Sequence, residues 1–139
     1  MIKQSNELTG MALNWAVATA MGLTRLKGDR SKGESGDLFV EVPLGNGTFN
    51  LIRWSPSTNW GQAGPIIEEC GMGVYRNYVR DGSGKWEGYV AAMRDPHGVG
   101  TGSSMCEAAM RCFVAGKLGE EVDIPEEYCD GPGPSRIIL

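Results

Sequence analysis

Glycine constrains the fold of this chain more than any other residue type, because 21 of its 139 residues are glycine. That share is about twice the ~7% usual for proteins. Glycine adopts positive φ angles without strain, so its frequency predicts many turns with short elements between them. The length fits one domain with an ordinary core. We place that domain at residues 1–130 and expect a flexible tail at 131–139.

Two helices are predicted near the ends of this domain. The first follows the N-cap Thr9 and ends at Gly22, with an apolar stripe along one side. The second has the strongest signal in the chain, because Ser104 and Glu107 form a Ser-x-x-Glu capping box and Gly119 ends the helix. Both helices have one apolar face and therefore need a partner layer.

Two β-hairpins are predicted between these helices. Residues 38–54 form the first hairpin around an Asn-Gly turn, and residues 74–93 form the second around an Asp-Gly turn. The resulting fold class is α+β, a small antiparallel sheet of two hairpins packed with an N-terminal and a C-terminal helix.

Three connecting segments have weaker signals. Residues 25–37 are charged and rich in glycine and serine, so we expect an exposed loop. Gly64-Pro65 is expected to start a short helix, because proline is preorganised for the first helical position. The acidic residues 120–128 are expected to extend from the last helix and to end in a turn.

Charge and cysteine usage exclude several classes of partner. The formal net charge is −4 and no dense run of lysine or arginine is present, so double-stranded nucleic acid is not expected as a partner. The four cysteines lack CxxC spacing and there is one histidine, so we expect no structural zinc and no cofactor. No signal peptide or membrane span is recognisable, which predicts a cytoplasmic protein without a membrane partner.

The densest group of recognition-type side chains follows the first hairpin. It consists of Arg53, Trp54, Ser55, Ser57, Thr58, Asn59 and Trp60. As a ligand platform, the indole rings would stack on a planar molecule, while the hydroxyl groups and the guanidinium would bind an anion. In the structural alternative, the rings fill the core and the polar groups satisfy the backbone of a turn. Both interpretations stay open on the sequence alone.

A second candidate site precedes the last helix. Its residues are Gly100, Thr101, Gly102, Ser103 and Ser104, with Arg111 two helical turns further on the same face. A glycine-rich entry to a helix presents free N–H groups to a phosphate, although the spacing is not that of a Walker A motif. An ordinary capped helix start, with Arg111 in a surface ion pair, is the alternative.

Catalytic constellations are not recognisable. His97 and Cys106 are close in sequence, but Cys106 lies beside the capping carboxylate of Glu107, which does not favour a thiolate. The paired acids are adjacent in sequence and therefore point in different directions on a helix. We name no catalytic residue and do not expect an enzyme.

Three segments of the chain together resemble one family. They are Glu7-Leu8-Thr9-Gly10 with Leu13-Asn14-Trp15-Ala16-Val17-Ala18, Ser55-Pro56-Ser57-Thr58-Asn59-Trp60 with Gly64-Pro65-Ile66-Ile67-Glu68, and Glu107-Ala108-Ala109-Met110-Arg111-Cys112-Phe113-Val114-Ala115 with Lys117-Leu118-Gly119 and Glu121-Val122-Asp123-Ile124-Pro125. They resemble the NinX-like family of lambdoid phage and prophage proteins, a domain of unknown function, over most of residues 5–128. The resemblance implies a phage accessory protein in a bacterial cytoplasm and brings no catalytic residues.

Two functions follow as hypotheses. The first is binding of a small anionic, nucleotide-type molecule, in its sharpest form the sequestration of a defence signal of the host. The second is a protein-interaction module that modulates a host or phage protein, since tryptophan and arginine are enriched in interface hot spots. The apolar end Ile137-Ile138-Leu139 leaves the oligomeric state open, with a two-fold homodimer as the default assembly.

Overall fold

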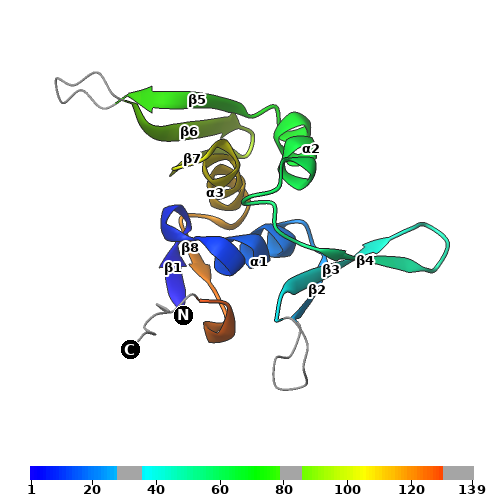
Figure 1. Ribbon diagram of the computed structural model, residues 1–139. Helices are drawn as coiled ribbons and strands as arrows, with labels where there is room; N and C mark the ends of the chain where they lie inside the picture. Colours follow the sequence, from blue (N-terminus) through cyan, green and yellow to red (C-terminus); the bar gives the residue numbers. More distant parts are fainter. Residues whose placement is uncertain (28–35, 79–85, 130–139) are drawn as a thin grey trace.

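The structure is a computed structural model that describes residues 1–27, 36–78 and 86–129 (Figure 1). Within these residues the chain forms three α-helices and three small antiparallel sheets, so the predicted α+β class is confirmed. The single sheet expected for the two hairpins is not formed, because each hairpin belongs to its own three-stranded sheet. The predicted tail and the turn of the second hairpin lie outside the described residues.

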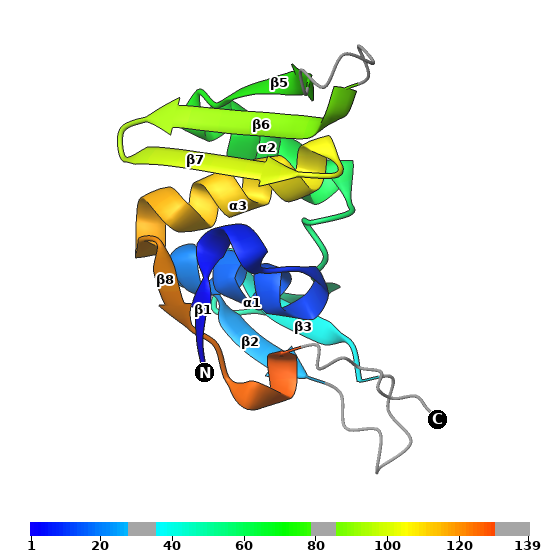
Figure 2. The same cartoon turned by 90° about the vertical axis from the view of Figure 1, so that its left-hand side faces the viewer.

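Helix α3 (Met105–Leu118) is the central layer of the fold. On one side it packs against the sheet of β5 (Gly73–Tyr78), β6 (Trp86–Arg94) and β7 (His97–Gly102). On the other side it packs against α1 (Gly10–Ala20), as Figure 2 shows. The core lies between these helices, and its largest fully buried side chains include Leu8, Leu13, Met110 and Ile124.

The second sheet lies on the far side of α1 and has the order β2 (Thr24–Lys27), β3 (Leu38–Pro43) and β4 (Phe49–Arg53). The hairpin of β3 and β4 confirms the first predicted hairpin. The loop predicted for residues 25–37 was wrong at its start, because Thr24–Lys27 form strand β2. Residues 28–35 lie outside the described part of the chain. Strand β2 was not predicted because its sequence is charged and has no apolar alternation. It is a strand because its backbone pairs with β3.

The third sheet joins the two ends of the described chain. Strand β1 (Ile2–Gln4) pairs with β8 (Glu121–Asp123), and the turn η3 (Glu126–Tyr128) follows. The final turn was predicted, but β8 was expected to be an irregular acidic extension. Each of these strands is three residues long, and Val122 is the buried residue of β8, so no alternating pattern could indicate it.

Helix α2 (Trp60–Cys70) starts earlier than predicted. The side chain of Asn59 caps it by accepting a hydrogen bond from the N–H of Gly61 at 2.8 Å, and Pro65 lies inside the helix and not at its start. Proline inside a helix removes one backbone hydrogen bond, which this helix tolerates because its cap and its packing favour the earlier start. Gly71 ends the helix in the left-handed conformation.

The glycine-rich segment before α3 is a strand and not a loop. Gly98, Gly100 and Gly102 of β7 alternate with exposed residues and face α3. A Cβ atom would lie 2.6 Å from the carbonyl oxygen of Cys112 at Gly98, and 2.8 Å from the backbone nitrogen of Ala108 at Gly102. Glycine at every second position therefore lets the strand lie directly on the helix backbone.

Candidate functional site

The central part of the predicted platform docks on helix α1. Trp54 is buried, and its indole N–H donates to the carbonyl oxygen of Asn14 at 3.1 Å. The buried Asn14 side chain accepts from the backbone N–H of Ser57 at 3.0 Å, and Ser57 is itself buried. For Trp54 and Ser57 these contacts favour the structural interpretation, because neither can face a ligand in this conformation.

The other polar groups of the segment mostly close a turn. Gln62 accepts from the N–H of Ser55 and donates to the carbonyl of Arg53, both at 2.7 Å. The hydroxyl of Thr58 donates to the carbonyl of Ser55 at 3.4 Å, and Asn59 caps α2. Gln62 therefore ties the start of α2 to the end of β4, a role that its residue type alone did not indicate.

Four members of the predicted platform are exposed, and two of them, Thr58 and Asn59, already make the turn and cap contacts. The Trp60 side chain is 52% exposed in the first turn of α2. The Arg53 guanidinium is exposed and forms an ion pair with Asp37 at 3.0 Å. Of the two predicted indole rings, only that of Trp60 is available for recognition.

The predicted phosphate site at the start of α3 already contains a carboxylate. Glu107 accepts from the N–H of Ser103 at 2.9 Å and from its hydroxyl at 3.3 Å. Ser104 accepts from the N–H of Glu107 at 3.1 Å, which confirms the N-cap. The Glu107 carboxylate thus stands where a phosphate would bind, and it balances the positive end of the helix.

Arg111 is tied to the backbone beside this helix start. Its guanidinium donates to the carbonyls of Leu8 and Thr101, each at 2.8 Å, and lies 3.6 Å from Glu107. The N–H of Thr101 donates to Asn6 at 3.0 Å. The structure therefore brings Thr101 and Arg111 together, and their contacts join the N-terminal segment to β7. The ion pair expected as the alternative is formed with Glu107, but only 12% of the Arg111 side chain is exposed, so the pair is mostly buried.

An exposed apolar surface on the first hairpin was not predicted. Figure 1 shows this hairpin projecting away from the helices. Phe49 and Leu51 of β4 are each 58% exposed, and Leu44 at the turn is also exposed. The alternation of side chains along a strand places Phe49 and Leu51 on one face and the half-buried Ile52 on the other. The apolar alternation was visible in the sequence, but not which face would be covered.

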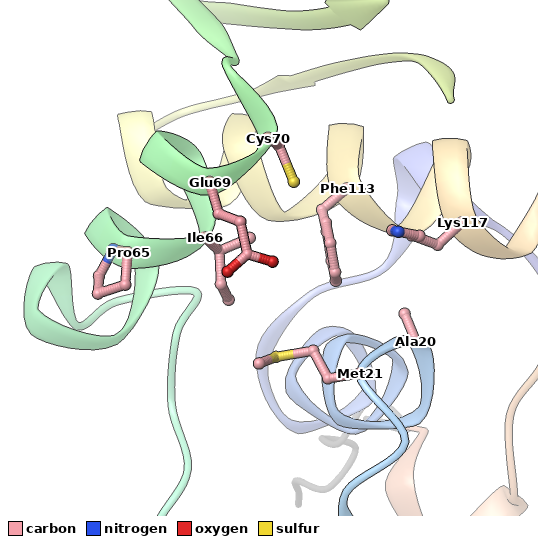
Figure 3. A pocket seen from close by; sticks show the side chains of 8 residues that line it. All are labelled: Ala20, Met21, Pro65, Ile66, Glu69, Cys70, Phe113 and Lys117. Atoms are coloured by element: carbon pink, nitrogen blue, oxygen red, sulfur yellow. The ribbon is translucent and has the colours of Figure 1, made fainter. Parts of the chain in front are cut away.

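A cavity of about 320 Å³ lies between α1, α2 and α3 (Figure 3). Its lining is mainly apolar, with a lysine, a glutamate and a thiol at its side: Ala20, Met21, Pro65, Ile66, Glu69, Cys70, Phe113 and Lys117. The Lys117 ammonium lies 5.9 Å from the centroid of the Phe113 ring. Burial raises the pKa of the Cys70 thiol, nearby Lys117 lowers it and Glu69 raises it, so the thiol is neutral at pH 7. These residues come from three separate elements, so no motif indicated the cavity.

The thiol considered for catalysis has the wrong protonation state. Burial raises the pKa of Cys106, whereas a nucleophilic cysteine needs a lowered pKa. Over residues 1–27, 36–78 and 86–129, no group of three or more histidine, cysteine or acidic side chains is placed to hold a metal ion. In the same part of the chain, none of the helices has the length and apolar composition to cross a membrane.

The family comparison agrees with the three segments that carry the resemblance. Residues 4–117 match the family described as Bacteriophage P22, NinX, a span that includes all three helices apart from the last residue of α3. A comparison with curated proteins found no match. Because the match covers far more than half of the chain, this protein belongs to the NinX family of phage proteins.

Proposed function

We propose that this phage protein acts as a protein-interaction module in the cytoplasm of the bacterial host. The observation that carries the proposal is the projecting hairpin with its exposed Phe49 and Leu51. Apolar residues grouped on one exposed face are typical of a surface that another protein covers. Trp60 adds a second exposed anchor of the type that dominates binding energy in interfaces.

Affinity capture from host lysate tests this proposal with matched variants. Wild-type protein should retain one partner in stoichiometric amount, and Phe49→Ser should lose it because the variant removes an apolar anchor. Tyr75→Ser is the control, since Tyr75 is an equally exposed aromatic side chain on the other three-stranded sheet. Loss of the partner in both variants, or absence of any stoichiometric partner, would contradict the proposal.

Binding of a small anionic, nucleotide-type ligand is a second candidate function, with sequestration of a defence signal as its consequence. The cavity between the three helices favours it, because its volume lies at the lower end of the range of small-molecule sites. Phe113 and Ile66 would contact an apolar or aromatic part of the ligand, and Lys117 would pair with its anionic group. Glu69 at the same cavity disfavours highly charged anions, which makes a singly charged ligand the better fit.

Calorimetric titration with a panel of nucleotides separates this function from the first. A ligand should bind with a Kd below about 100 μM, or roughly −5.5 kcal/mol. Lys117→Met should weaken that ligand at least about tenfold, because it removes the cation and keeps the apolar stem. Lys3→Met, on the strand β1, is the charge-matched control. If no nucleotide binds below this limit, the second candidate fails.

A further inference from the structure

The open edge of β4 carries the further inference. The hydrogen bonds from Leu44 N to Thr48 O and from Trp54 N to Leu38 O mark the residue pairs that bond across the hairpin. Bonded and non-bonded pairs alternate in an antiparallel ladder. Asn50 and Ile52 therefore bond to β3, while the N–H and C=O groups of the other three β4 residues point to the opposite side.

That side is the edge of the sheet. In the described part of the chain, β4 is the last strand in the order β2-β3-β4. The carbonyl of Arg53 already accepts from Gln62, but the N–H of Arg53 and both backbone groups of Phe49 and Leu51 face outward. An exposed row of unpaired backbone groups is a template for another strand.

We propose that β4 pairs in antiparallel orientation with β4 of a second copy of this chain, with the two-fold axis at Leu51. In this register each Leu51 exchanges both backbone bonds with the Leu51 of the other copy. Each Phe49 lies opposite Arg53 of the other copy, where the Arg53 N–H donates to the Phe49 carbonyl while the Arg53 carbonyl keeps its bond to Gln62. The two three-stranded sheets then form one continuous six-stranded sheet.

The side chains of β4 are complementary to themselves in this register. Directly opposite residues in a sheet interact, so the central pair would be leucine with leucine. The flanking pairs place the Arg53 guanidinium beside the ring of Phe49, a favourable cation–π arrangement. The two Arg53 residues lie four positions apart along the strands, and no like charges face each other.

This inference goes beyond the proposed function and is compatible with it. Strand pairing uses the edge of β4, whereas a protein partner would cover the face that carries Phe49 and Leu51. Dimerisation would place two such faces side by side and double the apolar surface. Mass measurement on the purified protein tests the dimer without any partner, so failure of one proposal leaves the other unaffected.

Analytical ultracentrifugation of the full chain tests the pairing. Wild type should sediment at twice the 14.9 kDa of one chain at concentrations near 100 μM. Leu51→Lys and Leu51→Glu should each be monomeric, because like charges meet at the two-fold axis. An equimolar mixture of the two variants should recover the dimer, because the charges are then opposite. Tyr75→Lys, on the other three-stranded sheet, should stay dimeric.

Three results would overturn the proposal: a monomeric wild type, a dimer that persists in both Leu51 variants, or folded variants whose mixture stays monomeric. Circular dichroism checks folding, because Leu51 lies opposite Glu41 within the hairpin and a glutamate there meets a like charge. If Leu51→Glu does not fold, Leu51→Pro replaces it. Proline removes the outward N–H and is tolerated on an edge strand, so this variant should fold and be monomeric.

Discussion

At the scale of single residues, the side chain of Asn14 holds the segment between β4 and α2 against helix α1. Asn14 lies buried in α1, and its side chain accepts the N–H of Ser57. Asn14→Ala removes this acceptor and leaves a buried donor without a partner, which costs about 1–3 kcal/mol. Urea unfolding should show this loss. Asn50→Ala, at an exposed position of β4, should stay within about 0.5 kcal/mol of wild type. An equal loss in both variants would contradict this role for Asn14.

The raised pKa of the Cys112 thiol predicts that the folded protein loses stability at alkaline pH. Burial raises its pKa from 9.0 to about 11, and nearby Cys70 adds to the rise. The unfolded chain therefore loses this proton first, so the stabilising contribution is complete below pH 9 and is lost as the pH rises to about 11. Urea midpoints measured across this window should fall more steeply for wild type than for Cys112→Ala. Identical slopes in the two proteins would show that Cys112 does not contribute.

At the scale of elements, the packing of β7 on α3 requires a glycine at position 100. A Cβ atom at Gly100 would overlap the carbonyl oxygen of Ala108 and the backbone nitrogen of Cys112. Gly100→Ala must therefore move the strand away from the helix, and we expect a loss of about 3 kcal/mol or more in unfolding free energy. Thr101→Ala changes the exposed face of the same strand and should cost less than about 1 kcal/mol. Similar stability of the two variants would contradict direct packing of β7 on α3.

The elements that could be predicted from sequence are those with local signals. The capping box defined α3, and the Asn-Gly turn indicated the first hairpin, because residues close in sequence determine both. Strands β1, β2 and β8 were missed because distant strands determine them by backbone pairing. Strand β7 was missed for a related reason: glycines that pack under a helix look like loop glycines in the sequence.

At the scale of the whole molecule, the predicted site residues were largely used to assemble the fold. Trp54 and Ser57 fix the segment between β4 and α2 to α1, and Arg111 joins β7 to the N-terminal segment. Residue type indicated that these groups form specific polar contacts, but not whether the partner is a ligand or the chain itself. Conversely, the exposure of Phe49 and Leu51 depends on which face of their sheet α1 covers, and only the assembled molecule determines that.

The layered arrangement predicts a gradient of amide hydrogen exchange across the molecule. Amides of α3 should exchange slowest, because this helix lies between a sheet and α1 and opens only with global unfolding (Figure 2).

In the projecting hairpin, the N–H of Ile52 bonds to β3 and should be protected at every concentration. The N–H of Leu51 faces the open edge, so β4 pairing should protect it at high concentration and lose that protection on dilution. NMR measurements at two protein concentrations give the exchange rates of the Ile52 and Leu51 amides in the same samples. Rapid exchange of Leu51 at both concentrations would exclude the pairing and leave the gradient intact, whereas fast exchange throughout α3 would contradict its central place in the fold.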